Sequence, residues 1–143
     1  METVGDLLRA KGRQVWTIRP DDTVLTALNR MAQHDVGSLV VTDGERVVGI
    51  LSERDYARKV ILRGKSSRDT PVWEIMTREV VFVRAEQTIR ECMASMTESR
   101  IRHLPVLEGG SLAGVISIGD VVKAIIEGQA FAIHALEDYI RGA

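Results

Sequence analysis

A chain of 143 residues is long enough for one ordinary domain or for two small units that share a core. With 45% hydrophobic residues, 27% charged residues and a formal net charge of −1, it is typical of a soluble globular protein that has no general attraction to nucleic acid or anionic membranes. A single cysteine excludes an internal disulfide and no apolar run reaches membrane-spanning length, so we expect a cytoplasmic protein.

The first part of the chain has the pattern of a small α+β unit preceded by a short lead-in helix. Pro20 stops a first extended run, and Asp43-Gly44 between two apolar runs is a hairpin signal. The predicted elements are a lead-in helix at 3–10, a strand at 15–18, an amphipathic helix at 21–35, strands at 38–41 and 46–51, and a closing helix from 53 to about 63.

A polar segment, residues 66–70, is the predicted linker to a second unit with the same order of elements. Thr88 and Glu91 form a capping box that marks the start of its amphipathic helix. Pro105 cannot donate to a β ladder, so its strand is predicted to lie at an edge or to be bulged. The predicted boundaries are a first repeat with its own lead-in helix at 1–65, the linker, a second repeat with its own lead-in helix at 71–128, and a C-terminal helix at 129–143.

The two units are copies of one another. Residues 15–56 align with residues 80–121 without a gap, at a displacement of 65 and with ten identical pairs. The identical pairs include Gly49/Gly114, Ser52/Ser117 and Asp55/Asp120. A unit of this size buries only part of its apolar surface alone, so we expect the copies to pack on each other.

The C-terminal segment adds a helix that the duplicated unit does not require. Residues 129–140 place Phe131, Ile133, Leu136 and Ile140 on a helix without an evident partner in the two repeats. We therefore expect this segment to cover a partner surface, most simply a second copy of the chain, which makes a homodimer the expected assembly.

Ser52-x-x-Asp55 and Ser117-x-x-Asp120 lie where a strand passes into a helix, and two interpretations fit them. Serine at the N-cap with a carboxylate three residues later is a helix-capping arrangement. The same geometry also offers free amides to a phosphate and a carboxylate to a ribose diol, with Gly49 and Gly114 allowing close approach of a ligand. The first interpretation needs no ligand, and the second predicts a nucleotide site.

Other chemistries have less support in the sequence. The three histidines show no metal-ligand spacing, and Cys92 lies on the apolar face of a helix, where a core position is expected. The glycines from Gly109 to Gly114 lack the lysine and hydroxyl residue that follow a phosphate loop. We find no catalytic constellation and no required cofactor, so the protein is not expected to be an enzyme.

The order βαββα with G-h-h-S-x-x-D at the last strand-to-helix step resembles the cystathionine β-synthase (CBS) domain. Two copies in tandem resemble the CBS pair, or Bateman module. The P-D-D-T helix start, Met76-Thr77 and the strand opening Arg102-His103-Leu104-Pro105 agree with it. The resemblance implies an α+β fold of two repeats related by pseudo-twofold symmetry, packed sheet to sheet, with clefts between them that commonly bind AMP, ADP, ATP, NAD or S-adenosylmethionine.

The resemblance also implies roles for individual residues. Asp55 and Asp120 would hold a ribose, and Ser52 and Ser117 would lie beside the ribose or phosphate. The other residues assigned to ligand binding in this way are Trp16, Val36, Gly37, Ser38, Arg54, Thr77, Val81, Ile101, Arg102 and His103. Because the second copy has Arg102 and His103 where the first has Gly37 and Ser38, the two sites are expected to be unequal.

The first functional hypothesis is a non-enzymatic regulatory module that binds an adenine nucleotide, AMP, ATP or NAD, as a regulatory ligand and signals to a partner by a conformational change. The alternative is a ligand-free interaction or dimerisation module in which both Ser-x-x-Asp motifs are only helix caps. Neither hypothesis involves nucleic acid or a membrane.

Overall fold

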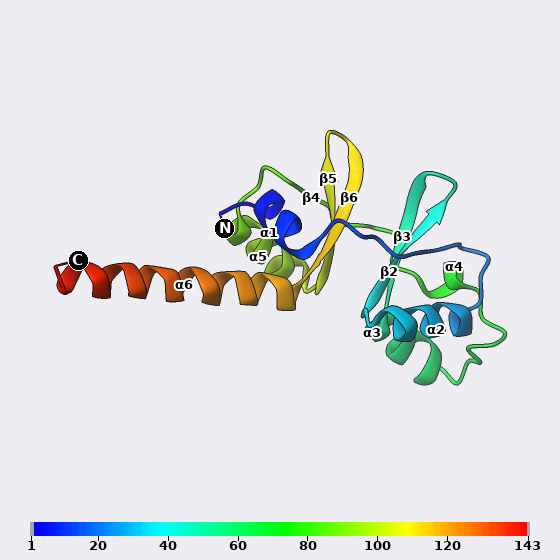
Figure 1. Cartoon of the computed structure of the whole chain (residues 1–143). Helices are drawn as coiled ribbons and strands as arrows, with labels where there is room; N and C mark the ends of the chain where they lie inside the picture. The colour runs from blue at the N-terminus through cyan, green and yellow to red at the C-terminus, as the bar shows by residue number, and fades with distance from the viewer. Residues whose placement is uncertain (1, 143) are drawn as a thin grey trace. The chain divides into compact units, whose positions relative to one another are not determined.

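The computed structural model describes residues 2–142, which fold as two compact units (Figure 1). The first-repeat unit is Val15–Val81. The second-repeat unit combines the residues up to Gln14 with those from Phe82 onward. The mixed helix and strand composition and the two three-stranded sheets confirm the predicted α+β class.

The first-repeat unit contains one sheet in the order β1-β2-β3, in which β1 is parallel to β2 and β2 is antiparallel to β3. Its elements are β1 (Thr17–Ile18), α2 (Val24–His34), β2 (Ser38–Asp43), β3 (Arg46–Ser52), α3 (Glu53–Tyr56), the π-helical turn η1 (Ala57–Ile61) and α4 (Val72–Ile75). The predicted linker, residues 66–70, is tied to the start of α2, because Val24 N donates to Thr70 O and Leu25 N to Ser67 O.

The second-repeat unit repeats this sheet in the order β4-β5-β6 with the same directions. Its elements are α1 (Val4–Lys11), β4 (Val83–Arg84), α5 (Ile89–Ser99), β5 (His103–Glu108), β6 (Ser111–Ser117) and α6 (Ile118–Ile140). The predicted C-terminal helix is present as the end of α6, which runs through Gly128 without a break. None of the helices in residues 2–142 has the length and apolar character that crossing a bilayer requires.

Both hairpins form where the sequence predicts them. Gly44 and Gly109 take positive φ angles of 63° and 59° at the turns, which glycine adopts without a steric penalty. Pro105 lies in the central strand of its sheet, so the edge alternative is wrong, but a bulge does follow at Val106/Leu107. In the first copy Val40, at the equivalent position, donates its N–H to Trp16 O, a bond that proline cannot make.

The lead-in helices are exchanged between the repeats. The N-terminal helix α1 packs in the second-repeat unit, where Gly5 N donates to Ala85 O and Val4 N to Gln87 O. The other lead-in helix, α4, packs in the first-repeat unit, where Val72 N donates to Asp22 O. Each copy therefore carries a lead-in helix in its sequence, but that helix packs in the unit of the other copy.

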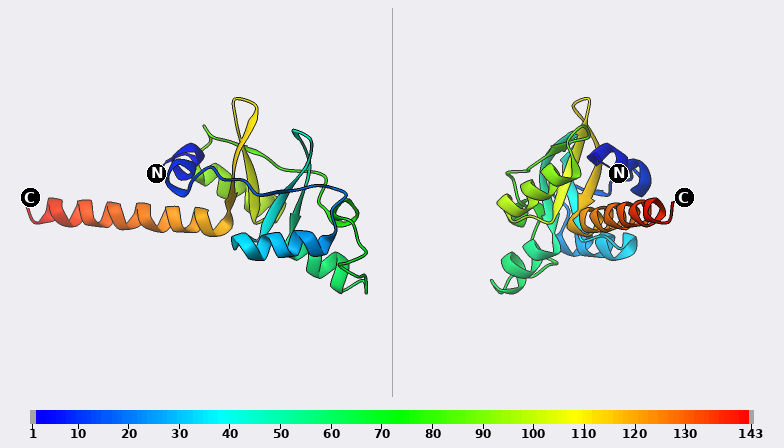
Figure 2. Two further views of the ribbon diagram at one scale, coloured as in Figure 1. Left: turned by 45° about the vertical axis from the view of Figure 1, so that its right-hand side comes forward. Right: turned by 90° about the vertical axis from the view of Figure 1, so that its left-hand side faces the viewer.

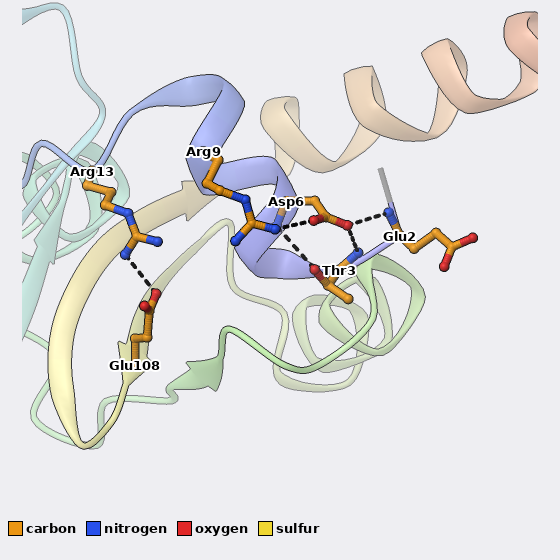
Figure 3. A network of polar contacts seen from close by, with 6 residues as sticks. All are labelled: Glu2, Thr3, Asp6, Arg9, Arg13 and Glu108. Carbon is orange, nitrogen blue, oxygen red and sulfur yellow. Dashed lines mark hydrogen bonds and ion pairs between the residues drawn. The ribbon is translucent and has the colours of Figure 1, made fainter.

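The N-terminal helix α1 is fixed at both of its ends (Figure 3). Thr3 and Asp6 form a capping box, and Arg9 pairs with Asp6 one turn later. Backbone N–H groups of Glu2 and Thr3 lower the pKa of Asp6 to about 2. After the helix, Arg13 pairs with Glu108 at 2.7 Å, so the chain that leaves α1 is held to the end of β5.

Apolar faces of the helices and sheets supply the core of each unit. In the first-repeat unit Ile18, Val41, Leu51 and Ile75 are at most 1% exposed. In the second-repeat unit Cys92 is fully buried, as predicted, and burial raises the pKa of its thiol to about 11. At neutral pH this thiol is protonated and unreactive, which fits a core residue.

Candidate functional site

Both Ser-x-x-Asp motifs form complete capping boxes. Ser52 Oγ accepts from Asp55 N at 3.1 Å, and Ser52 N donates to Asp55 Oδ2 at 3.0 Å. In the second copy Ser117 Oγ accepts from Asp120 N at 3.2 Å, and Ser117 N donates to Asp120 Oδ2 at 2.8 Å. The structural interpretation of the motif therefore holds at both junctions, and any ligand must share these carboxylates with the cap.

In the first copy, both carboxylate oxygens of Asp55 are occupied by the protein itself. Oδ2 accepts from the backbone and hydroxyl of Ser52, while Oδ1 lies 3.0 Å from Lys59 Nζ and accepts from Thr77 Oγ1 at 3.3 Å. The Asp55 side chain is only 12% exposed. The carboxylate at this junction therefore has no oxygen without a protein partner to offer to a ligand.

In the second copy, Lys11 from the exchanged helix α1 reaches Asp120. Its Nζ lies 2.6 Å from Asp120 Oδ2 and donates to Val115 O at 2.7 Å. Burial alone would raise the pKa of Asp120, but the hydrogen bond from Lys11 and the amide of Ser117 outweigh burial and hold that pKa below its usual value. Asp120 is therefore ionised at neutral pH and 25% exposed.

Lys11 takes over two contacts that Thr77 makes in the first copy. Thr77 N donates to Ile50 O at 2.9 Å, and its hydroxyl reaches Asp55. Val115 is the equivalent of Ile50, and its carbonyl accepts from Lys11 instead. Lys11 could not be recognised from the repeat, because the lead-in helices align at a displacement of 68, which pairs Thr77 with Arg9.

The segments predicted to flank the ligand do lie at the two helix starts. Gly37 O accepts from Glu53 N at 3.1 Å, and Arg102 O accepts from Ile118 N at 2.8 Å. Val36 and Ile101 hold equivalent positions just before them, where their amides bond to the ends of α2 and α5. Ser38 and His103 begin the central strands, each paired with the serine of its motif.

His103 belongs to the same electrostatic cluster as Lys11 and Asp120. Burial lowers its pKa below the usual value, the positive charge of Lys11 lowers it further, and Asp120 acts in the opposite direction. The imidazole is consequently neutral at neutral pH and keeps one nitrogen donor and one acceptor.

A cavity of about 460 Å³ opens within the second-repeat unit, between α1 and the first turns of α6. Figure 2 shows these two helices side by side. The cavity is lined by Leu7, Ala10, Lys11, Asp120, Lys123, Ala124 and Glu127. Among the residues that the sequence assigned to a ligand, Asp120 lies in this lining.

Trp16 lies outside the first strand, although the prediction placed that strand at 15–18, and its equivalent in the second copy, Val81, also precedes its strand. The strand β1 begins at Thr17 and β4 at Val83, because each first strand is only two residues long. One face of the Trp16 indole is stacked on His34, with ring centroids 3.4 Å apart. Arg54 lies in the first turn of α3, on the exposed side next to Asp55.

Comparison with known families identifies the fold. The model of the CBS domain matches residues 3–62 and again residues 72–127. The chain belongs to the CBS domain family. Both matched ranges begin with a lead-in helix, so in this CBS pair the family unit is continuous in sequence although its lead-in helices are exchanged in space.

Similar proteins span nearly the whole CBS pair. The mitochondrial CBS domain-containing protein CBSX3 of Arabidopsis thaliana is 39% identical over 98% of this chain and 72% of its own length. A proposed signal-transduction protein with CBS domains from Burkholderia ambifaria MC40-6 is 51% identical, with a TM-score of 0.86 over 89% of this chain and 96% of that one. A CBS-domain protein from Agrobacterium tumefaciens is 44% identical, with a TM-score of 0.82 over 86% and 92%.

Proposed function

We propose that this CBS pair is a non-enzymatic regulatory module that binds an adenine nucleotide at the strand-to-helix junction of its second-repeat unit. The observation that carries this proposal is the ionised Asp120 carboxylate at the wall of the cavity between α1 and α6. A carboxylate that accepts two hydrogen bonds suits a ribose diol, and His103 with the 101–103 segment adjoins the same helix start. AMP, ADP, ATP and NAD are the candidate regulatory ligands.

The difference between the two junctions favours the second one. Ser117 N and Lys11 Nζ both bond to Asp120 Oδ2, so a diol would use Oδ1. At Asp55 the contacts of Lys59 and Thr77 involve Oδ1 as well. A ligand at Asp55 would have to displace two of the protein's own contacts, and we therefore expect weaker binding there.

Signalling requires that the ligand prefer one conformation of the protein over another. In the second-repeat unit, Lys11 links Asp120 to α1, so a ligand bound beside both residues would change how firmly the end of α1 is held. A partner protein would respond to the resulting shift in α1.

Replacing Asp120 with alanine is expected to weaken nucleotide binding by about tenfold or more, since a hydrogen bond to a charged group contributes about 1.5–3 kcal/mol. Isothermal titration calorimetry with AMP, ATP and NAD measures this loss. The matched variant Asp55→Ala removes the same cap in the first copy and should leave the tighter site unchanged.

The ligand-free interaction module remains the alternative, and the two complete capping boxes favour it. It predicts that Asp120→Ala and Asp55→Ala lower thermal stability by similar amounts. It also predicts that saturating nucleotide leaves the melting temperature of the wild-type protein unchanged, whereas a bound ligand raises it by mass action. Unchanged stability with all three nucleotides would decide for this alternative.

We further propose that the end of α6 pairs with α6 of a second copy of the chain. Figure 1 shows that this end of the helix extends beyond the rest of its unit, and residues 127–140 are all exposed. Exposed apolar side chains recur at alternating spacings of four and three residues, with Gln129 in one position, as in a two-stranded coiled coil. These residues are Val122, Ile126, Ile133, Leu136 and Ile140.

Introducing a charge into this stripe is expected to convert a dimer into monomers. In a homodimer each Leu136→Asp substitution would be made on both helices and would bury two carboxylates without partners. Analytical ultracentrifugation across a concentration series measures the change. Phe131→Asp is the matched control, because Phe131 is 77% exposed but lies outside the stripe. A wild-type monomer, or equal effects of both variants, would contradict the proposal.

A further inference from the structure

The cavity between α1 and α6 contains two lysines that the capping function does not explain. Lys123 is exposed and makes no ion pair or hydrogen bond within residues 2–142. Lys11 uses two of its N–H groups on Asp120 and Val115, and an ammonium has three donors. Both ammonium groups therefore have donors to offer to a ligand in the cavity.

The position of the two lysines favours the binding of an anion in the cavity. Asp120 and Lys123 are three residues apart on α6, so they share one face of the helix close to its start. The positive end of the helix dipole adds to the field there. Lys11 approaches the same place from α1, and the cavity volume of about 460 Å³ is within the range of small-molecule sites.

A carboxylate at the opposite end of the cavity disfavours the binding of a long chain of phosphates. Glu127 lies one turn beyond Lys123 in the lining and has no ion pair in the described part of the chain. The charged lining consists of two lysines and two carboxylates, so its formal charges cancel. A single phosphate can be bound near Lys11 and Lys123, whereas a triphosphate would bring further negative charge towards Glu127.

We infer that Lys11 and Lys123 form a phosphate subsite and that the regulatory ligand is a nucleoside monophosphate. This inference rests on the proposed nucleotide site at Asp120. It assigns a function to the exchange of the lead-in helices, because the exchange is what brings Lys11 to the second junction. The first junction has Thr77 in place of Lys11, and the lysine there, Lys59, belongs to η1 and pairs with Asp55 Oδ1.

The test compares adenosine, AMP and ATP by isothermal titration calorimetry. Wild-type protein should bind AMP about tenfold or more tightly than adenosine, given the strength of hydrogen bonds to charged groups, and more tightly than ATP. Lys123→Ala and Lys11→Met should remove most of the AMP preference while adenosine binding changes less. Glu127→Gln should bring ATP binding closer to that of AMP.

Lys65→Ala is the matched control, because it removes a lysine from the first-repeat unit, where Lys65 pairs with Glu74. It should leave the ratio of AMP to adenosine affinity unchanged. Equal affinities of wild-type protein for adenosine and AMP, or an unchanged ratio in Lys123→Ala, would overturn the phosphate subsite alone. Failure of all three compounds to bind would overturn the proposed nucleotide site itself.

Discussion

Replacing Leu8 with alanine is expected to lower the free energy of unfolding by about 2–5 kcal/mol, the range for large-to-small substitutions in a core. Leu8 is fully buried, and its side chain lies directly over Gly114 of β6. It is therefore a principal contact between α1 and the second-repeat sheet. Urea denaturation followed by circular dichroism measures the loss.

Leu62→Ala provides the matched control for Leu8→Ala. Leu62 is 77% exposed, so the same change of side chain there should alter stability by less than about 0.5 kcal/mol. If Leu8→Ala were as mild as Leu62→Ala, α1 would not be an integral part of the second-repeat core, and the exchange of lead-in helices would not contribute to stability.

The internal repeat predicted the order and type of the elements because local signals decide them. Thr88 and Glu91 start α5 as a capping box, and Gly44 and Gly109 turn the two hairpins. These interactions join residues a few positions apart, so they depend on the local sequence and not on tertiary packing. The two-residue first strands were harder to place, since so short a pairing depends on its neighbour in the sheet.

The exchange of the lead-in helices could not be predicted in this way. An alignment of the copies shows that α1 and α4 are equivalent, but it does not show on which sheet each one packs. Only tertiary contacts such as the bond from Gly5 N to Ala85 O decide that. For the same reason the contact of Lys11 with Asp120 could not be predicted, because it joins residues on separate elements of the second-repeat unit.

The glycines assigned to ligand approach turn out to make room for the lead-in segments. A Cβ on Gly49 would lie 2.8 Å from Met76 Sδ and 2.9 Å from the backbone oxygen of Thr77. A Cβ on Gly114 would lie 2.6 Å from Leu8 Cδ2. The obstacle is therefore partly backbone in the first copy and a side chain in the second.

Gly49→Ala and Gly114→Ala are each expected to lower the free energy of unfolding by about 1–3 kcal/mol through overpacking. Their responses to a second substitution should differ. Leu8→Ala removes the side-chain atoms that would clash with the Cβ introduced by Gly114→Ala. The double variant should therefore be more stable than the sum of the two losses predicts. Double-mutant cycles measured by urea denaturation give the coupling, which is about 0.5–3 kcal/mol for residues in contact.

Met76→Ala should not rescue Gly49→Ala to the same extent. The Thr77 oxygen stays in place because it accepts a hydrogen bond from Ile50 N at 3.0 Å, and Thr77 N donates back to Ile50 O. Relieving the contact would require breaking this pair of bonds between β3 and the end of α4. Full rescue by Met76→Ala would mean that the backbone yields instead, and that Gly49 is needed only because of the methionine side chain.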